Sequence, residues 1–143
     1  MKKFVCNSLD DTGKVAEYFS EFCKPGQCFA LYGNLGFGKT TFTQYLIKTL
    51  NPNIENIISP TFNIIQTYPS EIAEIWHIDC YRLKSTEEFY ELGIDEAFSS
   101  CITIIEWPEI IEDLLPSDTI KIQFSKVDGQ RIIEVKAGSA CPR

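Results

Sequence analysis

Arginine and histidine are scarce in this chain of 143 residues. Arginine occurs only at Arg82, Arg131 and Arg143, and His77 is the single histidine. Lysine and arginine together number 13 against 20 aspartates and glutamates, which gives a net charge of −7. Because proteins that grip nucleic acids or anionic membranes do so with a basic face, this balance argues against either role for the chain alone.

The cysteines do not have the spacing of a metal site. None of the six forms a Cys-x-x-Cys pair, and the one histidine has no second histidine with which to share a metal, so a zinc site is not expected. The first residues show no apolar stretch of a signal peptide, and no apolar run approaches ~20 residues. We therefore expect a cytoplasmic protein with free thiols and no membrane segment.

The length and composition fit a single globular domain. Hydrophobic residues make up 44% of the chain and charged residues 23%, as in proteins with a proper core. At this length there is no room for a second, substrate-binding domain. We expect one domain over residues 1–137 and a loose tail over residues 138–143.

Strand-like and helix-like patterns alternate along the chain and predict an α/β layered fold with a largely parallel central sheet. The spacing of Ser8 and Asp11 predicts a capped first helix, and Asp128-Gly129 predicts a C-terminal β-hairpin. Helices are expected at 10–23, 40–50, 85–92, 94–98 and from Pro108 to Pro116, and strands at 28–32, 57–58, 63–68, 75–79, 101–105, 119–125 and 131–137.

A glycine-rich loop carries the chemistry. Residues 33–40 read GNLGFGKT, a full Gly-x-x-x-x-Gly-Lys-Thr phosphate-binding pattern, after a buried strand and before a helix. The glycines let the backbone point successive N–H groups at phosphates. Lys39 would reach the β- and γ-phosphate oxygens, and the Thr40 hydroxyl would face Mg²⁺. The pattern predicts a nucleotide site.

Two acids end apolar strands and are candidates to hold a metal ion or orient water. They are Asp79 and Glu106, and ligands in parallel sheets sit at such carboxyl ends. His77 alternates with Asp79 and so shares its face, although a lone histidine is more often structural. Trp107, beside Glu106, is expected to pack or to gate the site.

Other classes of phosphate-loop protein fit less well. The chain has no Asn-Lys-x-Asp motif for guanine, which disfavours a GTPase. Small-molecule kinases usually need several arginines around a lid, and only Arg82 and Arg131 fall within the folded part. A kinase remains the alternative, as does a regulatory nucleotide-binding module without turnover.

Four sequence blocks help to distinguish among these classes of phosphate-loop protein. They are GNLGFGKTT at 33–41, SPTF at 59–62, HIDCYRL at 77–83 with Leu92-Gly93 after it, and EWPE at 106–109. In order and spacing they resemble the TsaE (YjeE-like) family, the bacterial ATPase of the pathway that makes threonylcarbamoyladenosine in tRNA. The similarity extends from about Asp10 to about Val135.

This resemblance implies a three-layer P-loop NTPase fold that binds and hydrolyses ATP with Mg²⁺. It also implies two partner subunits of the ASKHA fold, of the TsaD and TsaB type, one of which transfers the threonylcarbamoyl group to a tRNA position beside the anticodon. The ATPase would activate or reset this complex and would meet tRNA only through it.

The resemblance also assigns roles by position. Lys39, Asp79 and Glu106 would be catalytic, Thr40 and Glu106 would hold magnesium, and 59–62 would form a switch-like loop. The chain departs from the family pattern at Asn34, where an acid is common, and at Phe37, where a small residue is usual. The implied nucleotide-binding residues, of which Thr12 and Arg131 would lie near the base, are Thr12, Gly33, Asn34, Leu35, Gly36, Phe37, Gly38, Lys39, Thr40, Thr41 and Arg131.

The arginine scarcity then predicts slow hydrolysis by the isolated chain. An arginine supplied by a partner can accelerate phosphoryl transfer by ~10³–10⁵. We therefore expect weak intrinsic activity that partner proteins stimulate.

Overall fold

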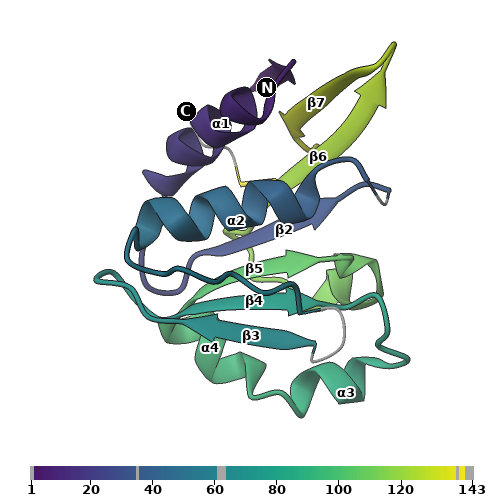
Figure 1. The fold of residues 1–143 in the computed structure, drawn as a ribbon. Helices are drawn as coiled ribbons and strands as arrows, with labels where there is room; N and C mark the ends of the chain where they lie inside the picture. The colour runs from purple at the N-terminus through teal and green to yellow at the C-terminus, as the bar shows by residue number, and fades with distance from the viewer. Residues whose placement is uncertain (1, 35, 61–63, 138, 141–143) are drawn as a thin grey trace.

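One mixed β-sheet forms the centre of the computed structural model, which describes residues 2–34, 36–60, 64–137 and 139–140 (Figure 1). Within these residues the strand order is β1-β7-β6-β2-β5-β4-β3. The strands are β1 Lys3–Cys6, β2 Cys28–Tyr32, β3 Ile65–Tyr68, β4 Ile75–Asp79, β5 Ile102–Glu106, β6 Ile120–Val127 and β7 Gln130–Val135. The helices are α1 Leu9–Ser20, α2 Lys39–Leu50, α3 Thr86–Tyr90, α4 Ile94–Ser100 and the 3₁₀ helix η1 Pro108–Leu114.

The sheet is parallel only in its central part. The pairs β6–β2, β2–β5 and β5–β4 are parallel, whereas β1–β7, β7–β6 and β4–β3 pair antiparallel. The prediction of a largely parallel sheet is therefore correct for the centre and wrong for both edges. The turn at Asp128-Gly129 has positive φ at both residues, which brings β7 straight back alongside β6, so the predicted hairpin is confirmed.

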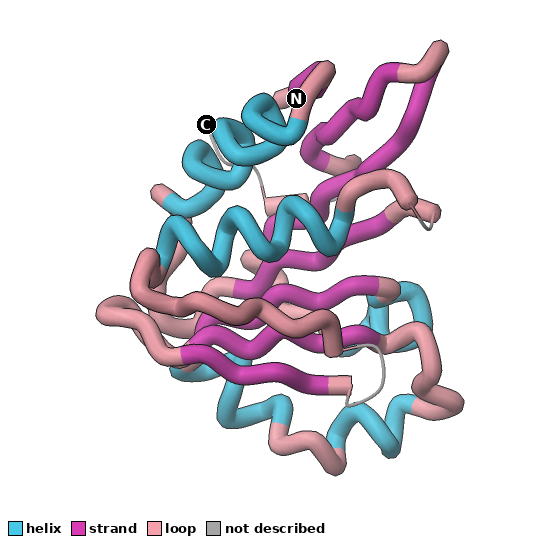
Figure 2. Tube along the Cα trace, in the orientation of Figure 1, coloured by secondary structure: helices cyan, strands magenta, loops and turns pink. Residues whose placement is uncertain are grey.

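Helices cover both faces of the sheet and give three layers. Helices α1 and α2 pack against each other on one face, while α3 and α4 lie on the other (Figures 1 and 2). Phe19 and Phe42 belong to the apolar core under α1 and α2. Ile78 and Phe89 belong to the core on the opposite face. Every residue of β2 and β5 is buried, as expected for strands covered on both sides.

The predicted strand at 57–58 is wrong, because a side chain takes the place of a neighbouring strand there. The hydroxyl of Tyr68 accepts a hydrogen bond from Ile58 N at 2.9 Å and donates one to Ile58 O at 3.2 Å. Both backbone polar groups of Ile58 are thus satisfied without a β-ladder. Strand β1 was not predicted: only four residues long, it pairs with β7 far along the chain.

The predicted helices all occur, with shifted ends. Ser8 caps α1 by accepting a hydrogen bond from Asp11 N at 3.2 Å, as the capping pattern predicts. Helix α1 ends at Ser20, three residues before the predicted end. The helix expected from Pro108 to Pro116 is a 3₁₀ helix that ends at Leu114. No helix in the described ranges is long and apolar enough to cross a lipid bilayer.

The last described residues lie beside the start of β6. Ala140 N donates to Thr119 O at 3.0 Å, and Lys121 N donates to Ser139 Oγ at 2.7 Å. The rest of the tail predicted over 138–143 lies outside the described residues.

Candidate functional site

A cavity of about 430 Å³ opens where the parallel strands β4 and β5 end and helix α2 begins. Such a position, at the carboxyl ends of parallel strands, is where α/β sheets bind ligands. The cavity is lined by Gly36, Gly38, Lys39, Thr40, Thr41, Asp79, Tyr81, Arg82, Glu106, Trp107 and Arg131.

The glycine-rich loop joins β2 to α2 and needs its glycines. Gly33, Gly36 and Gly38 all have positive φ. A Cβ atom on Gly33 would lie 2.5 Å from the backbone oxygen of Phe124, so no side chain fits there. Gly38 is the N-cap of α2, which has no side-chain cap and no acid in its first turn. The positive end of the helix is therefore left to attract an anion.

Lys39 is held inside the site. Its side chain is buried, and its ammonium group donates a hydrogen bond to Gly33 O. The Nζ atom also lies 3.5 Å from the centroid of the Trp107 ring, a cation–π contact. Burial lowers the pKa of Lys39, and the nearby Glu106 carboxylate opposes that shift. The Lys39 ammonium group thus contacts both the glycine-rich loop and the Trp107 ring.

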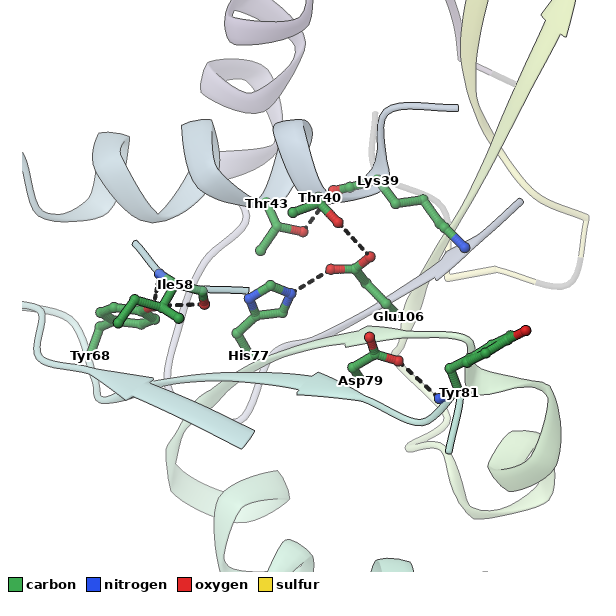
Figure 3. Close-up of polar contacts among 9 residues, drawn as sticks. All are labelled: Lys39, Thr40, Thr43, Ile58, Tyr68, His77, Asp79, Tyr81 and Glu106. Carbon is green, nitrogen blue, oxygen red and sulfur yellow. Dashed lines mark hydrogen bonds and ion pairs between the residues drawn. The ribbon is translucent and has the colours of Figure 1, made fainter. Parts of the chain in front are cut away.

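The two predicted acids lie side by side. Asp79 and Glu106 are register partners at the ends of the parallel strands β4 and β5. The hydroxyl of Thr40 donates to Glu106 Oε1 at 3.1 Å, which joins α2 to β5 (Figure 3). Asp79 Oδ1 accepts from Tyr81 N at 2.9 Å. Burial raises the pKa of Asp79, while the Tyr81 N–H bond lowers it.

His77 contacts the second oxygen of the same carboxylate. Its Nε2 lies 2.5 Å from Glu106 Oε2, and its side chain is fully buried (Figure 3). Because an ionised carboxylate only accepts hydrogen bonds, a bond to such a carboxylate requires the tautomer with hydrogen on Nε2. His77, which strand alternation places on the same face of β4 as Asp79, therefore contacts a residue of the neighbouring strand β5.

An aromatic pair forms part of the cavity wall. The rings of Tyr81 and Trp107 are 4.9 Å apart, and Tyr81 is 58% exposed. Trp107 has φ 56°, a conformation that a residue with a side chain seldom adopts. Sequence reasoning did not assign Tyr81 or Arg82 to the site. The available signal was position, because both directly follow a strand that ends in an acid.

The structure brings together part of the predicted nucleotide-binding set. Gly33 and Asn34 line a neighbouring cavity of about 340 Å³ instead. Phe37 packs against the core, and Thr12 is buried facing the Cys6 thiol. Leu35 and residues 61–62 of the predicted switch-like loop lie outside the described residues. The predicted residues that do line the 430 Å³ cavity are Gly36, Gly38, Lys39, Thr40, Thr41, Asp79, Glu106 and Arg131.

Both arginines of the described chain line the cavity. Arg82 follows β4, and Arg131 lies on β7. The Cδ atom of Arg131 lies 3.8 Å from the position that a Cβ on Gly38 would take. Low arginine content therefore does not mean a cavity without arginine. The cavity lining therefore does not support the composition argument for an arginine supplied by a partner, and the stimulation by partners stays a prediction.

The donor set suits a hard cation. The Thr40 hydroxyl and the Glu106 carboxylate are oxygen donors 3.1 Å apart. No group of three or more His, Cys, Asp and Glu side chains that could hold a metal occurs in the described ranges. Mg²⁺ fits such a sparse site, since it keeps several waters and takes phosphate oxygens from its substrate.

Comparison with known proteins indicates a family for the chain. The family model described as "Threonylcarbamoyl adenosine biosynthesis protein TsaE" matches residues 6–133. A protein of Rickettsia bellii named "tRNA threonylcarbamoyladenosine biosynthesis protein TsaE" is 44% identical over 127 residues, 89% of this chain and 88% of that protein. The protein of the same name from Bacillus subtilis is 36% identical over 131 residues, 90% of this chain and 80% of that one.

A solved structure is similar as well. The crystal structure of YdiB from Bacillus subtilis superposes with a TM-score of 0.76 at 31% sequence identity, and covers 92% of this chain and 82% of that one. The family model extends from before α1 into β7, and the relatives also match most of the chain. The chain therefore belongs to the TsaE family.

Proposed function

We propose that this protein is a Mg²⁺-dependent P-loop ATPase of tRNA threonylcarbamoyladenosine biosynthesis. The observation that carries the proposal is the hydrogen bond from the Thr40 hydroxyl, at the end of the phosphate-loop pattern, to the Glu106 carboxylate. Both residues line the same cavity. A loop of this pattern, a lysine and an acid at a neighbouring strand end are the parts that phosphoryl transfer needs. Membership of the family supports the pathway.

The chain's own residues suggest how the parts act. Lys39 would exchange Gly33 O and the Trp107 ring for phosphate oxygens, which are stronger partners for an ammonium group. Thr40 and Glu106 would hold the metal ion, which would neutralise charge on the phosphates. Bringing Lys39 out of its buried position would remove the burial that lowers its pKa and favour its charged form beside the phosphates.

Asp79 is suited to orient water. Its carboxylate lies beside that of Glu106 in the sheet register, with Oδ1 engaged by Tyr81 N. The raised pKa means that this carboxylate is a better proton acceptor than an exposed aspartate. We assign it the orientation of the attacking water, and Glu106 the metal.

The role in the pathway is an accessory one. The chain is small and carries a net charge of −7, so partner proteins are better suited to hold the tRNA. We propose partners of the TsaD and TsaB type, which would contact the chain while it turns over ATP. The proposal includes weak hydrolysis by the chain alone and faster hydrolysis with the partners present.

A phosphate-release assay tests the proposal. Release from ATP is measured for the chain alone, with the two partners, and with the partners and tRNA. We expect Mg²⁺-dependent release that rises with the partners and falls to background in Lys39→Ala. Glu106→Ala should lose turnover more than nucleotide binding. Lys14→Ala, an exposed lysine on α1, is the matched control.

Three results would contradict it. Equal release with and without partners would remove the accessory role. Tight ATP binding by Lys39→Ala in a calorimetric titration would exclude the proposed site. Transfer of the phosphoryl group to a small molecule, with no free phosphate, would instead indicate a kinase.

A further inference from the structure

The side chain of His77 makes one hydrogen bond among the described residues, and that bond goes to Glu106. The imidazole is fully buried on β4, and Nδ1 has no partner there. A buried ring nitrogen without a partner is a cost that an apolar side chain would avoid. The strand around it is apolar, with Ile75 and Ile78 fully buried. What the histidine adds over an apolar residue is therefore its contact with the Glu106 carboxylate.

The two oxygens of Glu106 are divided between different parts of the fold. Oε2 lies 2.5 Å from His77 Nε2, and Oε1 accepts from the Thr40 hydroxyl at 3.1 Å. A carboxylate with one fixed oxygen cannot rotate freely about its last side-chain bond. The contact on Oε2 thus determines the direction in which Oε1 points (Figure 3).

We infer that His77 is a positioning residue, which holds Glu106 so that Oε1 alone faces Thr40 and the metal ion that the proposed function would place in the cavity. This deepens the proposed function and rests on it for the presence of that metal ion. Hydrogen bonds that orient a ligating side chain commonly change metal affinity or activity 10- to 100-fold when they are removed. Glu106 would then bind the metal ion through Oε1 alone, and Asp79 would orient the attacking water.

The contact itself can be tested without nucleotide. His77 is the only histidine, so a ¹⁵N-labelled protein without a histidine tag gives a single imidazole spectrum. We expect the tautomer with hydrogen on Nε2, and a shift of the Nε2 resonance in Glu106→Gln. Thr103→Val, which alters another fully buried polar side chain of β5, should leave the resonance in place. An Nδ1–H tautomer, or an Nε2 signal that ignores Glu106→Gln, would overturn the inference.

The effect on the metal is measured by calorimetric titration of ADP with Mg²⁺ and with EDTA. The ratio of the two affinities reports the metal contribution without any turnover. His77→Phe should lower that ratio about 10-fold while the affinity in EDTA stays within about 3-fold. His77→Gln keeps an N–H donor near the position of Nε2 and should recover most of the ratio. Thr103→Val should match the wild type.

The outcomes separate the two proposals. A wild-type ratio in folded His77→Phe would overturn the positioning role even if the protein is an ATPase. If wild-type protein bound no nucleotide, the proposed function would fail, whereas the imidazole spectrum would still decide whether His77 orients Glu106. If His77→Phe did not fold, His77→Gln and the spectrum of Glu106→Gln carry the test.

Discussion

Replacing Gly33 by alanine tests whether the phosphate loop depends on a close backbone crossing. Gly33 has φ 140°, a conformation that L-residues rarely adopt. Strained backbone of this kind costs ~1–3 kcal/mol. In addition, the new Cβ would lie 2.5 Å from Phe124 O and 3.0 Å from Phe124 Cβ. Because the blocking atom is backbone of β6, relief requires a shift of the strand, which adds ~1–3 kcal/mol.

Gly129→Ala is the matched control. Gly129 also has positive φ, at 83°, but no heavy atom lies within 4 Å of its would-be Cβ. It should therefore lose only the backbone part, about 1–2 kcal/mol. Adding the two parts, we expect Gly33→Ala to lose about 2–6 kcal/mol, so the two variants should differ by the part that comes from the Phe124 crossing, about 1–3 kcal/mol.

Urea unfolding followed by circular dichroism measures the difference. A gap of that size corresponds to about 3–12 °C in Tm for a domain near this length. Gly36→Ala, with φ 82° and open space around its would-be Cβ, separates loop chemistry from stability and should unfold like Gly129→Ala. If Gly33→Ala and Gly129→Ala lost the same free energy within about 0.5 kcal/mol, the reasoning about the Phe124 crossing would be refuted.

Three further changes test the charges of the site. Lys39→Met should weaken ATP binding at least ~100-fold in calorimetry with no loss of stability, since burial penalises the ammonium; an equal loss in Lys48→Met, an exposed lysine of the same helix, would contradict this. Glu106→Gln should bind ATP within about 10-fold of wild type but turn over at least ~100-fold more slowly; unchanged turnover would remove Glu106 from the mechanism. The raised pKa of Asp79 means that the native state binds its proton more tightly than the unfolded state, so stability is lost as pH rises through that pKa. Asp79→Asn should therefore be more stable than wild type in urea at pH 7, and this advantage should shrink toward pH 3; an advantage that grew on acidification would contradict the sign.

The buried core strands and their acids could be predicted, because the cause is local. Strand β2 is a continuous apolar run, and β4 ends at Asp79 where the apolar run ends. The strand-end rule then brought Asp79 and Glu106 to one edge, and the register pairs them. The loop pattern likewise predicted a backbone that depends on glycine, and Gly33, Gly36 and Gly38 all have positive φ, which glycine adopts at little cost.

The edges of the sheet and the cavity wall depend on distant partners. Strand β1 has only four residues of mixed polarity. Its one partner is β7, which belongs to the β6–β7 hairpin at the other end of the chain. The failed strand at 57–58 depends on where the Tyr68 hydroxyl falls. The contact of Lys39 with Trp107 needs a tryptophan with positive φ, which no periodicity indicates.

The order of strands in the sheet has a consequence for folding during synthesis. Strand β2 emerges early, yet both of its neighbours, β5 and β6, come from the second half of the chain. Strand β2 has no partner until β5 is released at Glu106, and it lacks its partner on the other side, β6, until about Val127 is released, so the loop after β2 cannot take its final shape before then. Such high contact order slows folding and leaves strand edges open. The phosphate loop should therefore become competent only after almost the whole chain is made, in one late step.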